Sequence, residues 1–386
     1  MSKKTAKDVM LPHSKAKVAF YKSYLERYLS IMSVMEKCNR VNIYDVFCGR
    51  GVYEDGGLGS PIKAMETIKQ VRQNRPSDTI FHLYLNDKVM KNVDGVQDYI
   101  KSHFNDNLCQ VHYFCQPAEI LLEDLPSEMM LQEKSTRNLV FIDPYGYKQI
   151  HKKTLYTLLS NNRTEVLLFL PISFMHRFTR YAFTENDKKA QPLKEFISEF
   201  FDSNSPICKD EAMDVEEYIK LLAQAFSFGK RFYSTRFLIQ RDRKNYFALF
   251  FMTSNLLGLE KAVESLWELD NWNGKGFILE EDKNMPRIFD EQIFIDNKHR
   301  ENIEKLKTII LSALQERARS NCEIYELTLI NGFKPTHAKE ALTLLEQQNI
   351  IDVKKFGGAE RRKGAFYINY GQAKDSMFPT IRIQLL

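Results

Sequence analysis

The chain has 386 residues, 44% of them hydrophobic and 27% charged, which is enough to bury a core and to form two or three domains. No apolar run approaches the roughly 20 residues of a membrane span, the first residues lack a secretory signal, and the six scattered cysteines contain no C-x-x-C pair. We therefore expect a cytoplasmic protein with no membrane contact, disulfide framework or metal site, whose net charge of +5 is compatible with a nucleic-acid partner.

The first forty residues predict a helical segment that packs on the core, because hydrophobic side chains recur at three- and four-residue spacing between Leu11 and Arg40. Short apolar runs follow, each separated from the next by enough residues for a crossover helix. These predicted strands are 41–47, 81–86, 111–115, 139–142 and 165–170. Apolar strands that alternate with helices are typical of a parallel sheet covered on both faces.

A long helical stretch, about 175–226, follows the fifth predicted strand. Two further apolar runs, 232–240 and 246–253, are joined by a polar link that is too short for a crossover, so they should pair antiparallel. Parallel strands followed by such a hairpin predict an α/β protein with a Rossmann-like, seven-stranded methyltransferase fold. This domain would span 41–272 and include the helical stretch as an insertion.

Residues 273–300 predict a linker, and 301–386 predict a second domain. Its expected elements are helices at 301–319, 324–331 and 335–348 and a hairpin formed by 350–355 and 365–370. Three helices with a two-stranded wing indicate a winged helix-turn-helix, which either docks on nucleic acid or serves as a protein–protein module. The basic wing residues that would contact phosphate are Lys354, Lys355, Arg361, Arg362 and Lys363.

The most informative motif follows the first predicted strand, where Asp45 precedes a G-x-G sequence formed by Gly49 and Gly51. These glycines let the backbone adopt positive φ and pass close to a nucleoside cofactor. Glu54 stands where a dinucleotide site has its third glycine, and the chain has no P-loop pattern. The motif therefore favours S-adenosylmethionine over NAD or ATP as the cofactor.

Residues after the next two strands extend this site. Asp87 follows the second strand, where this fold usually places a carboxylate on the ribose hydroxyls, although a solvated acid in a turn would look the same. Gln116 follows the third strand at the usual adenine contact, where the expected Asp is absent. The predicted cofactor contacts are thus Asp45, Phe47, Gly49, Gly51, Asp87 and Gln116.

The fourth strand ends in Asp143, Pro144 and Tyr145. An Asp-Pro-aromatic sequence here is typical of methyltransferases that act on amino nitrogens. The carboxylate and the proline carbonyl accept hydrogen bonds from the target amine, and the ring stacks on a planar base, often one flipped out of its helix. We predict these three residues as the catalytic group, although the same sequence also forms a common turn.

Two other features have two interpretations each. The long loop 49–60 is either a substrate or partner loop or a solvated turn. His176, Arg177 and Arg180, after the fifth strand, either contact phosphate or form the polar face of a helix.

Several stretches, in order, resemble the three-Cys-motif partner (TcmP) family. They are 11–17 (LPHSKAK), 44–56 (YDVFCGRGVYEDG), 59–61 (GSP), 141–146 (FIDPYG) and 246–250 (YFALF). The resemblance implies a bacterial protein of methyltransferase-like fold, encoded in mobile-element or phage-defence settings. It also implies a radical-SAM-like partner protein that holds the three cysteines. The D-P-[FY]-G form further resembles that of tRNA guanine-N2 methyltransferases, which favours a nucleobase amine as the target.

The leading interpretation is an S-adenosylmethionine-dependent methyltransferase that acts on an amino group of a DNA or RNA base, which the winged helix would deliver. The main alternative is a catalytically inactive adaptor or effector of the same fold that binds nucleic acid and a protein partner in a defence complex. A third is a metal-dependent nuclease built on Asp45, Glu54, Asp55 and Asp143.

Overall fold

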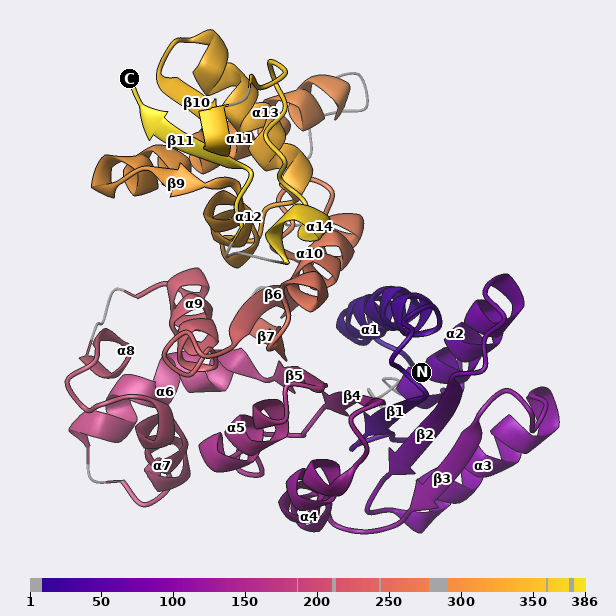
Figure 1. Ribbon diagram of the computed structural model, residues 1–386. Coiled ribbons are helices and arrows are strands. Elements are labelled where there is room, and N and C mark those ends of the chain that lie inside the picture. Colours follow the sequence, from indigo (N-terminus) through magenta and orange to yellow (C-terminus); the bar gives the residue numbers. More distant parts are fainter. Residues whose placement is uncertain are drawn as a thin grey trace. The chain divides into compact units, whose positions relative to one another are not determined.

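The computed structural model forms two compact units (Figure 1). It describes residues 9–185, 187–209, 213–242, 244–277, 291–358, 360–374 and 378–386, with the side chains of 291–294 left out. The first unit comprises the described residues through Gly258 together with Phe277, and the second comprises 259–276 and the described residues from 291 onward. The division falls earlier in the chain than residue 272, where we predicted the first domain to end.

A mostly parallel sheet of eight strands, in the order β3-β2-β1-β4-β5-β7-β6-β8, forms the centre of the fold. Its strands are β1 (Arg40–Asp45), β2 (Ile80–Asn86), β3 (Gln110–Phe114), β4 (Thr136–Ile142), β5 (Thr164–Leu170), β6 (Tyr233–Asp242), β7 (Asn245–Thr253) and β8 (Gly276–Phe277). The first five pair in parallel, and β7 runs antiparallel to both β5 and β6. The mostly parallel α/β sheet is confirmed. The expected count of seven was wrong, because a two-residue edge strand has no periodicity to read.

The helices of the first unit that lie between the parallel strands follow the predicted alternation. They are α2 (Ser60–Asn74), α3 (Met90–His103), α4 (Ala118–Leu131) and α5 (Lys152–Ser160). Every residue of β5 is buried, as expected for a strand covered on both faces. The sheet therefore supplies a rigid frame whose strand ends carry the polar residues described below.

The N-terminal helix α1 (Pro12–Met32) packs its aromatic side chains on the sheet. The ring of Tyr21 lies 4.6 Å from that of Phe141 on β4, and the ring of Tyr24 lies 4.6 Å from that of Phe251 on β7. The Tyr24 hydroxyl also donates a hydrogen bond to the buried carboxylate of Glu165 on β5. These contacts fix α1 against three strands that are far apart in the sequence (Figure 1).

The predicted helical stretch between β5 and β6 consists of short helices: α6 (Ile172–Thr184), α7 (Gln191–Phe200), α8 (Pro206–Lys209) and α9 (Val215–Ala225). Aromatic rings join it to the sheet. Phe226 makes edge contacts with Phe200 of α7, at 5.1 Å between ring centroids, and with Phe250 of β7, at 4.9 Å. This insertion therefore shares the hydrophobic core of the first unit.

The second unit combines helices with a small antiparallel sheet in the order β10-β11-β9. Helix α10 (Leu256–Leu269) begins just before the division between the units. The later elements are α11 (Glu291–Glu316), β9 (Arg319–Ser320), α12 (Asn321–Ile330), α13 (Pro335–Gln347), β10 (Ile351–Lys355), α14 (Tyr370–Ala373) and β11 (Ile381–Leu385). The predicted linker 273–300 is helical from Glu291, and its part 278–290 lies outside the described residues.

The predicted hairpin between 350–355 and 365–370 is wrong, because β10 pairs with β11. The segment 365–370 has a strand-like composition, but it buries Phe366 and Ile368 without joining the sheet. Strand β11 instead alternates buried isoleucines with the exposed Arg382, the pattern of a strand that is buried on one face.

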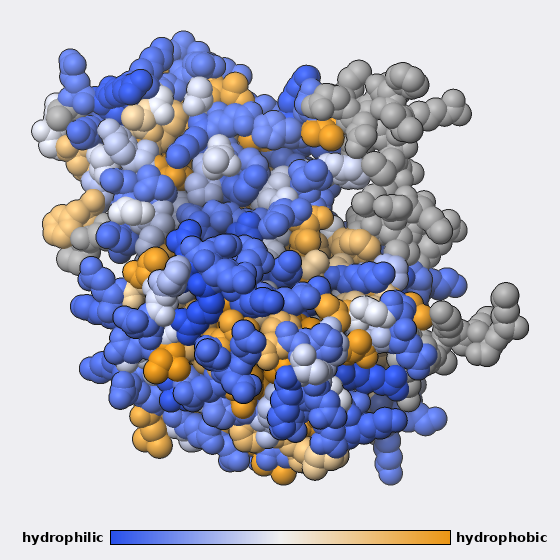
Figure 2. All heavy atoms as spheres, turned by 90° about the vertical axis from the view of Figure 1, so that its right-hand side faces the viewer, coloured by the Kyte–Doolittle hydropathy of each residue, from blue (hydrophilic) through white to orange (hydrophobic). Residues whose placement is uncertain are grey.

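On the face drawn in Figure 2, hydrophobic residues are interspersed with hydrophilic ones. Within the part of the chain that the structure describes, no helix combines the length and the apolar character needed to cross a membrane.

Candidate functional site

Four of the predicted site residues lie at one edge of the sheet. Asp45 ends β1, Asp87 follows β2, Gln116 follows β3 and Asp143 follows β4. These strands are neighbours and run parallel, so their carboxyl ends meet at the same edge. In open α/β sheets this edge is where ligands bind.

The glycine turn after β1 has the backbone geometry that the motif predicted. Gly49 and Gly51 have φ values of +62° and +71°, which L side chains rarely adopt. A Cβ on Gly51 would lie 2.6 Å from a methyl carbon of Val96, and the N–H of Gly59 donates to the Gly51 carbonyl at 2.6 Å. The turn is therefore closed tightly against α3 and the start of α2, and a side chain at position 51 would collide with them.

Asp87 holds this turn. One carboxylate oxygen accepts a hydrogen bond from the N–H of Gly49 at 3.1 Å. The other accepts from the N–H of Val89 at 2.8 Å and from the side-chain amide of Asn92 at 3.1 Å. Asp87 is thus a buried structural acceptor and not a solvated acid. A carboxylate has about four acceptor positions, so it can still accept a further donor such as a ribose hydroxyl.

Sequence reasoning missed Asn86, the last residue of β2. Its side-chain amide donates to the carbonyl oxygens of Val46 and Gln116, both at 3.1 Å, and its oxygen accepts from the N–H of Gln116 at 3.2 Å. The Gln116 side chain is half-buried. Asn86 therefore fixes the ends of three strands together, and a polar residue that closes an apolar strand was the available signal.

Asp45 is the most unusual group at this edge. It is 1% exposed, and among the described residues neither of its carboxylate oxygens has an aligned hydrogen-bond partner. Its pKa is raised to about 7, mainly by burial and also by the Asp143 carboxylate, while the Ser60 hydroxyl, the Lys17 ammonium and the Phe47 N–H moderate the rise. A buried acid without donors is costly. Its environment favours a ligand that brings hydrogen-bond donors or positive charge.

Sequence reasoning also missed Lys17, which lies on α1. Its ammonium forms an ion pair with the carboxylate of Asp143 and lies 4.7 Å from the ring centroid of Phe169. Both partners of the pair are largely buried. Lys17 belongs to the stretch 11–17, which was noted for its resemblance alone. Nothing in its spacing indicates that helix α1 would bring it to the end of β4.

The remaining predicted substrate residues differ in exposure. Pro144 is buried, whereas Tyr145 is 83% exposed and its ring lies 5.9 Å from the ammonium of Lys88. Phe47, predicted as a cofactor contact, is half-buried and packs against the main hydrophobic core. The Tyr145 ring is therefore exposed enough to stack on a ligand, whereas Phe47 is part of the core packing.

The loop 49–60 is folded and not an open turn. Val52 and Leu58 form a β-bridge, and the Asp55 carboxylate accepts from the N–H groups of Met10 at 3.2 Å and Gly57 at 3.1 Å. Glu54 is exposed. Over the residues described, no three His, Cys, Asp or Glu side chains are grouped so as to hold a metal ion. The four acids considered for a nuclease, Asp45, Glu54, Asp55 and Asp143, therefore do not form such a metal-binding group among these residues.

The five basic residues predicted to contact phosphate differ in their exposure to solvent. Lys354, Arg362 and Lys363 are exposed, and Lys355 is half-buried. Lys354 pairs with Asp352 at 2.9 Å. Arg361, by contrast, is buried and forms an ion pair with Glu346 of α13, with its guanidinium 5.2 Å from the Phe366 ring centroid. Arg361 therefore supports the second unit internally.

Comparison with known proteins gives similarity in structure only. No family model matches the chain, and no curated protein matches it. It is similar to the O-methyltransferase from Bacillus cereus in complex with SAH, at 12% identity over 64% of this chain and 84% of that one, with a TM-score of 0.33. It is also similar to Trm1 from Pyrococcus horikoshii with S-adenosyl-L-methionine, at 10% identity over 65% and 58% of the two chains, with a TM-score of 0.33.

A further similar structure is TrmK of M. capricolum with S-adenosyl-homocysteine, at 9% identity over 71% of this chain and 92% of that one, with a TM-score of 0.26. The fold assignment rests on the strand order in this chain. An antiparallel β7 between β5 and β6, beside five parallel strands, matches the Rossmann-like methyltransferase sheet. Membership of the TcmP family stays a prediction.

Proposed function

We propose that this protein is an S-adenosylmethionine-dependent methyltransferase that acts on an amino group of a nucleic-acid base. The observation that carries the proposal is Asp45, a fully buried carboxylate without an aligned donor beside a glycine turn. Burial raises its pKa to about 7 despite the nearby Ser60 hydroxyl and Lys17 ammonium, so its charged form would gain from a further cation and further hydrogen-bond donors. S-adenosylmethionine brings both, and it would supply the electrophilic methyl group.

Residues of the carboxyl edge would hold this cofactor. Asp45 would accept hydrogen bonds from its amino group, Asp87 would accept from the ribose hydroxyls, and the half-buried side chain of Gln116 would contact the adenine. Gly49 and Gly51 let the backbone approach closely. The structures named above that contain S-adenosylmethionine or its product have this type of fold, which supports the choice.

Asp143, Pro144 and Tyr145 would bind the target base. The Asp143 carboxylate and the Pro144 carbonyl would accept hydrogen bonds from the exocyclic amine, and the exposed ring of Tyr145 would stack on the base. Holding the amine in line accounts for most of the rate gain in such a reaction. Because Lys17 pairs with one carboxylate oxygen of Asp143, the incoming amine would bind the other oxygen or displace that ammonium.

The second unit would deliver the nucleic acid. We infer a winged helix-turn-helix from its helices followed by an antiparallel sheet in the order β10-β11-β9. Lys354, Lys355, Arg362 and Lys363 are the candidate phosphate contacts. Arg361 is left out because its ion pair with Glu346 is buried.

The ion pair of Lys17 with Asp143 favours a second candidate function. If the ammonium stays in place, it takes up part of the acceptor capacity that the amine would need. The protein would then be a catalytically inactive adaptor that binds nucleic acid and a protein partner. The TcmP resemblance suggests a radical-SAM-like partner and a defence context for this alternative.

Calorimetric titration with S-adenosylmethionine separates the two functions. We expect binding to the wild-type chain, a loss of about 100-fold or more in the Asp45→Asn variant, and unchanged binding in the Glu54→Gln variant. Glu54 is an exposed acid of the loop that follows β1 and is therefore the matched control. Absence of binding to the wild type at millimolar cofactor would refute the enzyme and leave the adaptor as the leading function.

A further inference from the structure

One face of helix α6 carries exposed aromatic rings. Phe174 is 47%, Phe178 40% and Tyr181 42% exposed. Their spacing of four and three residues places them on the same side of the helix. The rings of Phe174 and Phe178 lie 4.8 Å apart, so they form a continuous surface. We call Phe174, Arg177, Phe178 and Tyr181 the α6 strip.

The α6 strip begins beside the proposed substrate loop. The ring of Phe174 stacks on that of Tyr147, with 6.5 Å between centroids and 17° between planes. Tyr147 is two residues beyond the exposed Tyr145. Helix α6 also starts directly after β5, which pairs in parallel with β4, so both approach the same edge of the sheet. The strip is therefore packed, through the buried Tyr147, on the loop that also carries Tyr145.

The α6 strip also carries a positive charge, on Arg177. The Arg177 guanidinium donates to the carbonyl oxygens of Ser173 at 3.0 Å and Lys244 at 3.2 Å, and to the amide oxygen of Asn245 at 3.3 Å. All three acceptors are uncharged, so these contacts hold the side chain without neutralising it. The far end is different, because the Tyr181 hydroxyl donates to Asp187 at 3.1 Å. The cation thus lies in the part of the strip that is nearer to the substrate loop.

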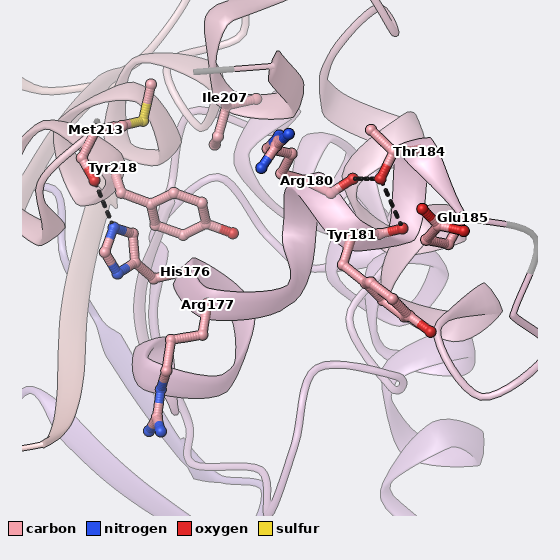
Figure 3. Close-up of a pocket in the computed structure, with 9 residues that line it drawn as sticks. All are labelled: His176, Arg177, Arg180, Tyr181, Thr184, Glu185, Ile207, Met213 and Tyr218. Atoms are coloured by element: carbon pink, nitrogen blue, oxygen red, sulfur yellow. Dashed lines mark hydrogen bonds between the residues drawn. The ribbon is translucent and has the colours of Figure 1, made fainter. Parts of the chain in front are cut away.

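A pocket of about 430 Å³ adjoins the strip and shares Arg177 and Tyr181 with it. Pockets of about 300–1,000 Å³ hold small ligands, so this one has room for a nucleotide. In Figure 3 the Arg180 side chain extends toward the wall formed by Ile207 and Tyr218, whereas the Arg177 guanidinium points away from them. Two hydrogen bonds of 2.7 Å tie the pocket lining to α6: one joins the Thr179 and Tyr218 hydroxyls, and the other runs from His176 Nε2 to the Met213 carbonyl oxygen.

We propose that the α6 strip and this pocket bind single-stranded nucleic acid and lead it to the loop at Asp143. Bases would stack on Phe174 and Phe178, Arg177 would contact the backbone phosphate, and the pocket would receive one nucleotide. A single strand fits because its bases expose the ring faces that a duplex keeps stacked inside. The delivery to Asp143 rests on the proposed function, but the binding itself does not.

Fluorescence anisotropy of the full chain with labelled single-stranded RNA, single-stranded DNA and duplex DNA of one sequence tests this proposal. We expect the Phe174→Ala/Phe178→Ala variant to bind single strands at least about tenfold more weakly. Arg177→Gln should lower the slope of log K against log salt by about one phosphate contact. The matched controls are Tyr156→Ala and Lys153→Gln on α5, an exposed ring and an exposed cation, and both should bind as the wild type does.

Equal loss of single-strand binding in the control and strip variants would overturn the proposal. So would unchanged single-strand binding in folded strip variants, with folding checked by circular dichroism and thermal melting. The RNA and DNA arms identify the kind of strand that is preferred. Calorimetry with S-adenosylmethionine is a separate readout. A chain that binds single strands through α6 but binds no cofactor would refute the proposed function and leave this inference standing.

Discussion

Two buried carboxylates lie at opposite ends of the sheet, Glu165 and Asp45, and their surroundings differ. Glu165, in the first part of β5, accepts hydrogen bonds from the hydroxyls of Tyr24 and Thr253, the latter at 3.0 Å. Asp45, at the carboxyl end of β1, has no aligned donor among the described residues, although the Ser60 hydroxyl lies nearby. Burial raises both pKa values to about 7. A buried acid with its donors in place belongs to the structure, and one without them is available to a ligand.

The largest expected effect separates methyl transfer from cofactor binding at the carboxyl edge of the sheet. Asp143→Ala should reduce methyl transfer to an acceptor nucleic acid by about 100-fold or more, because the amine loses its acceptor. Its affinity for S-adenosylmethionine should stay within about threefold of the wild type. Glu165→Gln should leave both quantities unchanged. Joint loss of transfer and cofactor binding in Asp143→Ala would contradict this division of roles.

The next largest expected effect concerns the free energy of unfolding and the carboxylate of Glu165. Glu165→Ala should lower the free energy of unfolding by about 2–4 kcal/mol, since it leaves a cavity and two hydroxyls without their acceptor. Asp45→Asn should cost less than about 1 kcal/mol, because it breaks no aligned hydrogen bond. Urea denaturation of both variants measures the difference. If Asp45→Asn proved as destabilising as Glu165→Ala, Asp45 would be a structural residue as well.

The pH dependence of stability follows from the same pair. Both folded pKa values of about 7 lie above the ordinary 3.8 and 4.5, so the folded state binds these protons more tightly than the unfolded one. The stabilisation is complete below about pH 4 and is lost as the pH rises through 7. Each acid should contribute on the order of 3 kcal/mol to this fall.

Unfolding by urea between pH 4 and pH 8 checks this. Glu165→Gln and Asp45→Asn should each flatten the curve. Saturating S-adenosylmethionine should remove only the part due to Asp45. A cofactor-bound curve as steep as that of the free protein would contradict the assignment of Asp45 as the cofactor's partner.

The smallest expected effect is a change in the pKa of Asp45, but not of Glu165, when Lys17 is replaced. Its ammonium lowers the pKa of Asp45, so Lys17→Met should move the Asp45 titration to higher pH. The Glu165 titration should not move, because its pKa is set by burial and by the Tyr24 and Thr253 hydroxyls. Carbon NMR of the two carboxyl groups can follow both. An equal shift at Glu165 would show that Lys17 acts through the fold as a whole.

Local patterns were sufficient for most of the first unit. The apolar runs located the parallel strands and the antiparallel pair β6–β7, and the acids after β1, β2 and β4 were identified because strand ends can be read from the sequence. Sequence patterns did not predict the pairing of strands that are separated by a long connection. Strand β11 joins β10 across a long connection that contains a buried, strand-like segment, and β8 is too short to show any period.

The sequence by itself determined that acids and glycines follow successive strands of a parallel sheet, because alternation and strand ends are local properties. Only the tertiary structure decided which acids are satisfied. Asp87 gains three donors, from the glycine turn after β1, from its own turn and from α3. Glu165 gains a hydroxyl from α1, and Asp143 gains the ammonium of Lys17. Asp45 gains none that is aligned. The physical reason is that hydrogen bonds and burial depend on distant segments, whose approach no local pattern encodes.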